Sequence, residues 1–304
     1  MTSIPVSDKK VNRHIKTGTY IRLFDPWKSP LCTCPLKYSF SPYTGCGHQC
    51  LYCYATAYIR NHYNPRPKNR LLEILRREVR KLDRRLVISI SNSSDPYTPP
   101  EEELQLTRDA LKLLSKEGFK LLLITKSTLV RRDLDILSRT PSAVMVTITT
   151  LNDNIAKILE PGAPPPSDRL DALHEICNKV PCGVRIDPLI PGINWDVNMI
   201  GRLIERLAEI GVKHVSTSTY KARYDSLSRL TRAFPDKASM LKELYVNKGE
   251  RIRGSYYLPR RLRYEMLTTI RNLALEKGIG FSVCREGFSN LNTAPSCDGS
   301  YLIS

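Results

Sequence analysis

The chain of 304 residues lacks several sequence features that mark other classes of protein. It has no apolar run of about 18 residues, the length that a membrane-spanning helix needs. The segment from Met1 to Lys16 is polar and basic, without the apolar stretch of a secretory signal. No glycine-rich dinucleotide or phosphate-loop motif occurs, which argues against a nicotinamide or ATP enzyme. We therefore expect a cytoplasmic protein with reduced thiols and no membrane partner.

The chain also has fewer acidic than basic residues. The chain has 47 Lys and Arg against 30 Asp and Glu, for a net charge of +17. This surplus predicts a polyanionic partner, and DNA or RNA is the first candidate. Charge alone leaves the partner open, because basic surfaces also occur on proteins that bind no nucleic acid.

Cysteines are concentrated in one short stretch. Three of the nine, Cys46, Cys50 and Cys53, follow Gly45 with the spacing C-x3-C-x2-C. Thiolates this close suit a soft metal centre. Four would close a zinc or iron–sulfur site, whereas three leave one metal position open for chemistry. The alternative is a structural zinc loop, and His48 within the loop is more typical of a shaping hydrogen bond than of a ligand.

Four further cysteines lie near the two ends of the chain: Cys32, Cys34, Cys284 and Cys297. A C-x-C pair is too strained to bridge with itself. If the chain ends meet, the four thiols would form a closed site for zinc or for an auxiliary iron–sulfur cluster. Buried free thiols or disulfides are the alternatives. Cys177 and Cys182 flank a predicted strand and are expected to be packing residues.

Apolar runs alternate with helical patterns along most of the chain. Strands are predicted over residues 37–40, 86–91, 120–125, 143–149, 183–187 and 213–218, and helices over 55–63, 71–82, 100–116, 130–138, 153–159, 167–178 and 195–210. This alternation indicates an α/β fold with a parallel sheet covered by helices. Six units favour a partial TIM barrel, a (β/α)6 core over residues 36–220. An N-terminal arm (1–35) precedes it, and a mostly helical C-terminal extension (221–304) with a late strand over 280–284 follows.

In such barrels the chemistry lies at the carboxyl ends of the strands. Polar residues follow or end four successive predicted strands: Ser94 and Asp95, Lys126, Thr147, and Arg185. We take these as candidate ligand-binding residues.

The cysteine loop after the first strand, with Tyr52 just before its last cysteine, resembles the radical S-adenosylmethionine superfamily. Other segments are similar to its spore photoproduct lyase-like branch: Ser94-Asp95-Pro96-Tyr97, Thr125-Lys126-Ser127, Leu159-Glu160-Pro161 with Arg169-Leu170, and residues 185–192. The resemblance implies that Cys46, Cys50 and Cys53 bind a [4Fe–4S] cluster whose fourth iron holds S-adenosylmethionine. It also implies an enzyme that receives electrons from a donor such as ferredoxin or flavodoxin.

The resemblance suggests roles for the polar residues. Tyr52 would pack near the adenine, Ser94 and Asp95 would face the ammonium group, and Lys126 would pair with the methionine carboxylate. Each has a plainer alternative: support of the loop for Tyr52, a tight turn for Asp95, and a position on the barrel rim for Lys126. Thr147 and Arg185 are candidates for the ribose and for cofactor or substrate oxygens.

One position departs from the spore photoproduct lyase-like pattern. That branch has a cysteine, which returns a hydrogen atom to the product radical, where this chain has Asn92. An amide N–H bond is too strong for that task, so Tyr52, Tyr54 and Tyr97 are the candidate catalytic radical relays.

We expect an enzyme acting on nucleic acid. The alternatives are a radical enzyme acting on a protein side chain or small metabolite, and a non-catalytic, metal-stabilised nucleic-acid-binding protein.

Overall fold

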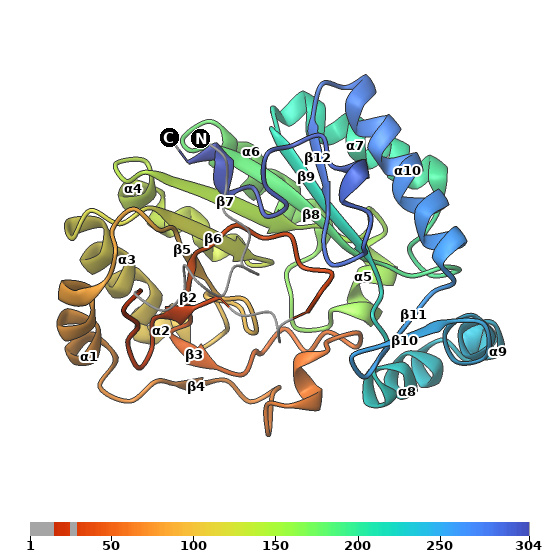
Figure 1. Ribbon diagram of the computed structural model, residues 1–304, viewed down its shortest axis with the longest axis horizontal. Helices are drawn as coiled ribbons and strands as arrows, with labels where there is room; N and C mark the ends of the chain where they lie inside the picture. The colour runs from red at the N-terminus through yellow and green to blue at the C-terminus, as the bar shows by residue number, and fades with distance from the viewer. Residues whose placement is uncertain (1–14, 25–28, 304) are drawn as a thin grey trace.

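The computed structural model describes residues 15–24 and 29–303, and an eight-stranded sheet lies at its centre (Figure 1). The strands are β1 (Arg22–Leu23), β2 (Tyr38–Phe40), β5 (Ile88–Ile90), β6 (Leu121–Thr125), β7 (Ser142–Thr147), β8 (Cys182–Leu189), β9 (His214–Thr219) and β12 (Gly280–Val283), and they pair in this order. Neighbours from β2 to β12 are parallel, whereas β1 runs antiparallel to β2 at one edge. The six predicted strands and the late strand are confirmed.

The strands of the sheet are largely buried because both of its faces are covered. All six residues of β7 are buried, and so are all three of β5. In Figure 1 the sheet curves, with most helices behind it and at its sides. Residues 29–37 and the segment after β12 cross in front of it. The confirmed architecture is therefore a partial barrel that does not close.

The helices are α1 (Leu71–Glu78), α2 (Glu101–Leu104), α3 (Leu106–Lys116), α4 (Leu134–Leu137), α5 (Asp153–Leu159), α6 (Pro166–Cys177), α7 (Val197–Ile210), α8 (Tyr224–Ala233), α9 (Ala238–Lys242) and α10 (Arg260–Glu276). Neighbouring helices that cover the sheet contact one another, as α6 contacts α7 and α7 contacts α10. No helix in the described part of the chain is long and apolar enough to span a membrane.

Two predicted helices contain a left-handed residue within the range that the sequence pattern indicated. The segment after the cysteine loop forms only a 3₁₀ turn, Ala55–Ala57, and Asn61 then adopts a left-handed conformation with φ of 51°. Gln105, with φ of 50°, separates α2 from α3. A single left-handed residue interrupts the helical hydrogen-bond ladder, and apolar periodicity does not reveal it.

The C-terminal segment contains a hairpin that the sequence analysis did not predict. Its strands, β10 (Glu250–Ile252) and β11 (Ser255–Tyr257), pair antiparallel. Arg253 and Gly254 connect them with φ of 49° and 75°, and two positive φ values match the right-handed twist of a tight hairpin. The extension is therefore helical apart from this hairpin and β12.

The expectation that Cys177 and Cys182 are packing residues is wrong, because they form a disulfide. Cys177 ends α6 and Cys182 begins β8, and the short turn between them brings the two Cα atoms to 5.2 Å. This separation lies within the range that a disulfide bridges.

Candidate functional site: a cysteine-lined cavity at the carboxyl ends of the strands

The cysteine loop begins after β3 (Tyr43–Thr44), which pairs with β4 (Arg66–Pro67) at the base of the loop. Gly45 has φ of 87°, and a Cβ atom there would lie 2.6 Å from the carbonyl oxygen of His62. Only glycine therefore fits where the loop turns. The backbone amide of Cys46 donates to that same carbonyl at 2.7 Å.

The three thiols of the loop line one cavity of about 750 Å³ together with the strand ends. Cys50 is buried, and Cys46 and Cys53 are half-buried. Burial raises the pKa of the Cys50 thiol to about 12, although the Lys126 ammonium acts in the opposite direction. These thiols are therefore protonated in the chain alone, and a metal must displace their protons on binding.

Three cysteine thiols are the donor set of a [4Fe–4S] cluster with one open iron, because each thiolate binds one of the four irons. Among residues 15–24 and 29–303, no three His, Cys, Asp or Glu side chains are placed to bind one metal ion.

Asp95, at the end of the loop after β5, is buried and surrounded by donors. Its oxygens accept from Thr125 Oγ1 at 2.7 Å, the Lys126 amide at 2.8 Å and the Tyr97 amide at 3.0 Å. His48 Nε2 lies 3.2 Å from Asp95 Oδ2. Burial alone would raise the pKa of Asp95, but His48 and these hydrogen bonds lower it to about 2. Its contacts favour the turn alternative over direct binding of an ammonium group.

Ser94, Tyr52 and Lys126 line the cavity beside the thiols. Ser94 Oγ is 2.5 Å from Ser41 Oγ, and the Lys126 ammonium lies 5.6 Å from the centre of the Tyr52 ring. Burial tends to lower the pKa of Lys126, but Cys50 in its ionised form and the Glu160 carboxylate outweigh burial and raise the pKa. Lys126 is therefore a cation in the cavity wall that can pair with a carboxylate.

Glu160 and Arg169 form a buried pair behind Tyr52. Arg169 Nη1 lies 2.5 Å from Glu160 Oε2, and both side chains are at most 1% exposed. The Tyr52 hydroxyl donates to Glu160 Oε1, and Arg169 Nη1 donates to the Thr147 carbonyl at 3.1 Å. The pair thus connects the cysteine loop to the end of β7.

Thr147 and Arg185 occupy paired positions on β7 and β8, and both line the cavity. Arg185 forms an ion pair with Asp187, which also accepts from Ser218 Oγ at 2.5 Å. Burial opposes ionisation of Asp187, but Arg185 and Lys221 hold its pKa at about 2. Arg185 is thus already paired with a carboxylate inside the site.

The three predicted tyrosine relays have different positions. Tyr52 and Tyr54 line the cavity, and the Tyr54 hydroxyl donates to the Asn92 carbonyl at 3.0 Å. Tyr97 does not line the cavity: it is 2% exposed, and its ring lies 6.0 Å from the Arg132 guanidinium. The turn at Asp95, which accepts from the Tyr97 amide, directs the ring into the protein. The geometry offers no support for a catalytic role of Tyr97.

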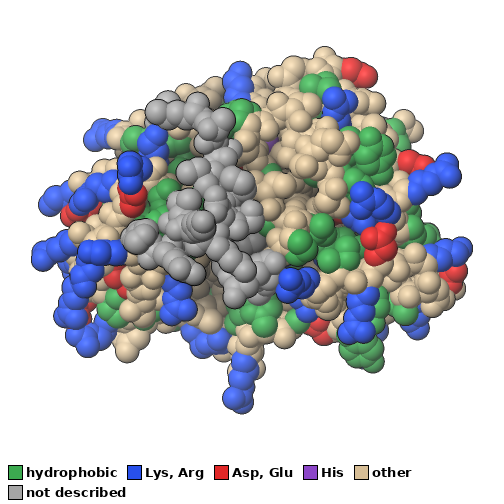
Figure 2. All heavy atoms as spheres, in the orientation of Figure 1, with side chains coloured by type: hydrophobic (Ala, Val, Ile, Leu, Met, Phe, Trp, Pro, Cys, Tyr) green, Lys and Arg blue, Asp and Glu red, His purple; other side chains and the backbone are tan. Residues whose placement is uncertain are grey.

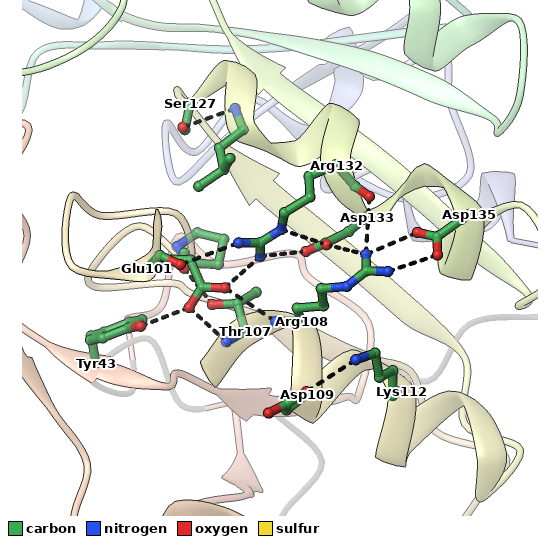
Figure 3. A network of polar contacts seen from close by, with 12 residues as sticks. Tyr43, Glu101, Thr107, Arg108, Asp109, Lys112, Ser127, Arg132, Asp133 and Asp135 are labelled. Carbon is green, nitrogen blue, oxygen red and sulfur yellow. Dashed lines mark hydrogen bonds and ion pairs between the residues drawn. The ribbon is translucent and has the colours of Figure 1, made fainter. Parts of the chain in front are cut away.

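A polar network fixes the loops that carry Asp95 and Lys126 (Figure 3). Buried Glu101 accepts from the Tyr43 hydroxyl at 2.7 Å and pairs with Arg132 at 2.6 Å. Arg132 and Arg108 both pair with buried Asp133, at 2.9 and 2.7 Å. The network links β3, α2 and the 3₁₀ turn Thr128–Asp133, so the segments after β5 and β6 keep a fixed spacing.

The four terminal cysteines do come together. Cys34 Sγ and Cys297 Sγ are 3.2 Å apart, and the Cys32 thiol interacts with Cys34. Cys284 follows β12 and lies close enough to act electrostatically on both Cys32 and Cys297. Cys32, Cys34 and Cys284 line the same cavity as the loop cysteines.

Sequence reasoning assigned no role to several buried residues at this site. Lys221 follows β9 and Glu286 follows β12, and their side chains pair at 3.0 Å. The carboxyl-end rule that selected Lys126 would also have selected both. Glu160 and Arg169 belong to the segments around α5 and α6, and only the tertiary fold brings them to Tyr52.

The fold and the cysteine-lined cavity define a class of enzyme, and comparison with known families agrees. The Radical SAM superfamily model matches residues 40–203, more than half of the chain. The chain therefore belongs to the radical SAM superfamily, whose enzymes use a [4Fe–4S] cluster and S-adenosylmethionine.

Its relatives include uncharacterized proteins. ORF301 of Acidianus two-tailed virus is 30% identical over 253 residues, covering 73% of this chain and 80% of that protein. MJ0683 of Methanocaldococcus jannaschii is 33% identical over 215 residues, covering 64% and 81%.

Among solved structures, a spore photoproduct lyase variant matches with a TM-score of 0.67 and 16% identity, over 88% of this chain and 80% of that one. A second variant, with bound AdoMet and dinucleoside spore photoproduct, matches with a TM-score of 0.65 and 17% identity, over 84% and 76%. At these identities the likeness concerns the fold, and it confirms the expected partial barrel.

Proposed function

We propose that this chain is a radical S-adenosylmethionine enzyme acting on nucleic acid, with reducing electrons from a small donor such as ferredoxin or flavodoxin. The observation that carries the substrate is a pair of like charges in the wall of the cysteine-lined cavity. Arg22 and Lys68 both line it. Burial, together with the positive charge of Arg22, lowers the pKa of Lys68 to about 8. Two neighbouring cations beside a catalytic cavity favour an anionic group between them, such as a phosphate.

The cysteines and the strand-end residues have separate tasks in this proposal. When bound, the cluster and S-adenosylmethionine supply a carbon radical that abstracts a hydrogen atom. Cys46, Cys50 and Cys53 hold three irons as thiolates. Lys126 pairs with the methionine carboxylate, and Ser94 accepts from the ammonium group.

Other residues keep this site in shape. Asp95 does not bind the cofactor but positions the Lys126 backbone and His48. Tyr52, buried against Glu160, closes the loop side of the cavity and excludes water. Thr147 and Arg185 stand further along the sheet, where Arg185, already paired with Asp187, orients oxygens of the cofactor or substrate.

The surface charge supports the same substrate class. Figure 2 shows more Lys and Arg than Asp and Glu side chains on the visible face, mainly toward its edges and most densely on the left, where α1 and α3 lie. This distribution agrees with the net charge of +17 and favours binding of a phosphate backbone.

Asn92 argues for a product different from that of a repair lyase. Its side-chain amide donates to Ser39 Oγ at 2.7 Å and accepts from Ser89 Oγ at 3.1 Å, so it is held by β2 and β5. An amide does not return a hydrogen atom to a carbon radical. Tyr54, which donates to the Asn92 carbonyl at the cavity wall, is the phenol that we propose for the relay.

Salt-dependent binding tests the substrate class. We expect the affinity for DNA or RNA oligonucleotides, measured by fluorescence anisotropy, to fall steeply with KCl. Lys68→Met and Arg22→Met should each reduce the log–log slope by about 1. Arg206→Met, on the exposed side of α7, is the matched control and should leave the slope unchanged. Binding that does not respond to salt would favour a protein side chain or small metabolite as substrate.

Product formation tests the chemistry. Anaerobically reduced protein should convert S-adenosylmethionine to 5′-deoxyadenosine, faster when nucleic acid is bound, and Cys50→Ala should abolish the product. Tight salt-sensitive binding without 5′-deoxyadenosine would support the non-catalytic binding protein instead.

A further inference from the structure

Four thiols from the two ends of the chain meet beside the cavity, apart from the three cysteines of the loop. Cys34 and Cys297 are 6% and 3% exposed, with their sulfur atoms 3.2 Å apart. Cys32 and Cys284 are half-buried and complete the group. Cys34 and Cys297 are separated by 263 positions in the sequence, and only the fold brings them together.

Lys37 and Asp298 connect the N-terminal and C-terminal segments that carry the four thiols. They form a buried ion pair whose side chains are 2% and 3% exposed. Asp298 follows Cys297 directly, and Ser300 Oγ donates to Asp298 Oδ1 at 2.7 Å. The carbonyl of Cys297 accepts from Ser216 and Ser282, each at 2.9 Å. The C-terminal thiol is therefore positioned by several contacts to the core sheet.

Three cations lie near the thiols, and two of them, Lys37 and Arg185, are paired with carboxylates. The Arg185 guanidinium hydrogen-bonds Cys284, and the charge of Arg285 also acts on Cys284. Lys37 lies close enough to act on both Cys34 and Cys297. Buried cations next to cysteines stabilise thiolates, the form in which cysteine binds metals.

We propose that Cys32, Cys34, Cys284 and Cys297 bind a second [4Fe–4S] cluster. Four thiolates suit its four irons, whereas the loop supplies only three. Four thiolates would also hold a single zinc ion, and the metal analysis below distinguishes the two metals. The sulfur atoms of Cys34 and Cys297, 3.2 Å apart, would separate when each binds its own iron. The chain belongs to a family that binds [4Fe–4S] clusters, and this favours the cluster.

The second cluster faces the cavity that the loop cysteines line. Cys32, Cys34 and Cys284 are in its wall, and Arg285, next to Cys284, lies 5.4 Å from the ring centre of Tyr54. With all four irons bound by protein, such a cluster has no open position for substrate and transfers electrons. This inference is independent of the nucleic-acid substrate.

Metal analysis of the full chain, purified and reconstituted without oxygen, tests the second cluster. Wild type should hold about eight irons and eight acid-labile sulfides per chain, because each [4Fe–4S] cluster contributes four of each. The triple variant Cys46→Ala, Cys50→Ala, Cys53→Ala should keep about four of each and the Mössbauer signature of a [4Fe–4S] cluster. The quadruple variant Cys32→Ala, Cys34→Ala, Cys284→Ala, Cys297→Ala should also keep about four, now bound by the loop.

The double variant Cys177→Ser, Cys182→Ser is the matched control, because it removes two cysteines outside both sites and should keep about eight irons. The proposal is overturned if wild type holds only about four irons, or if the triple variant holds zinc. A Cys34–Cys297 disulfide, found by alkylation and mass spectrometry in the anaerobic protein, would also overturn it. If a multiple variant fails to fold, the wild-type iron count still decides, and Cys32→Ser alone, at a half-buried ligand, should alter the Mössbauer spectrum of one of the two clusters.

Discussion

His48 Nε2 lies 3.2 Å from Asp95 Oδ2, and this buried contact joins the cysteine loop to the end of β5. On its other side, His48 Nδ1 is 3.1 Å from the carbonyl oxygen of Gly162. A Cβ atom on Gly162 would lie 2.2 Å from the Gly47 carbonyl, so the segment after α5 packs directly on the loop. His48 is therefore a shaping residue of the loop, as its position between two cysteines predicted.

Asp95→Asn should loosen the loop. The substitution removes the negative charge of the carboxylate. It also places the Asn N–H₂ group opposite groups that themselves donate hydrogen bonds, so one buried hydrogen bond is lost. We expect the free energy of unfolding to fall by about 3 kcal/mol, with lower iron occupancy at the loop. Urea unfolding and iron analysis measure the two effects. Asp109→Asn, at an exposed ion pair with Lys112, should change stability by about 0.5 kcal/mol or less. Equal effects of the two substitutions would contradict the positioning role of Asp95.

Arg169→Met should lower the free energy of unfolding substantially. It leaves the Glu160 carboxylate buried without its cation, and Glu160 is 1% exposed. Breaking such a pair typically costs about 3–5 kcal/mol. The exposed Arg202 of α7 offers a matched control, and Arg202→Met should stay within about 0.5 kcal/mol of wild type. Recovery of stability in the double variant Arg169→Met, Glu160→Gln would identify the unpaired charge as the cause.

Much of the barrel could be predicted because most strands of its parallel sheet are rich in apolar residues, whereas β9 is buried but mostly Ser and Thr. The apolar run from Ala143 to Val146 predicted such a strand, and it lies within β7. The carboxyl-end rule then located Lys126 and Thr147 in the cavity wall, since both follow from strand positions alone. The C-x3-C-x2-C spacing located the cysteine loop, because its three proposed metal ligands are close together in the sequence.

The remaining features depend on contacts between distant residues. Tyr97 and Asp95 both follow β5, but the Tyr97 side chain is buried away from the cavity. The Tyr97 amide donates to Asp95 Oδ1, and this turn changes the direction in which the Tyr97 ring points. The β10–β11 hairpin depends on positive φ at Arg253, a residue type that does not signal such a turn. The Cys177–Cys182 bridge requires the exact end of α6, which apolar periodicity fixes only to within a few residues.

His214 should make stability depend on pH. Burial lowers its pKa from 6.5 to about 4, although Asp298 acts in the opposite direction. The unfolded chain therefore binds the proton first as the pH falls, and stability is lost from about pH 6.5 down to about pH 4. Between pH 7 and pH 5 wild type should lose about 2 kcal/mol more than His214→Gln. Urea unfolding at both values measures this difference. His174→Gln, on the exposed side of α6, should show the same pH dependence as wild type.

Lys126→Met should separate cofactor binding from cluster assembly. The ammonium group lies in the cavity wall over Tyr52, whereas the three loop thiols do not need it as a ligand. Loss of one charge-assisted hydrogen bond corresponds to about 1.5–3 kcal/mol, so the affinity for S-adenosylmethionine should fall about 10- to 100-fold. Equilibrium dialysis of the reconstituted protein measures the affinity, and iron analysis should show unchanged cluster content. Lys116→Met, at the exposed end of α3, should leave both quantities unchanged. Unaltered affinity in Lys126→Met would place this lysine on the barrel rim as a structural residue and direct the search for the carboxylate partner to Arg185.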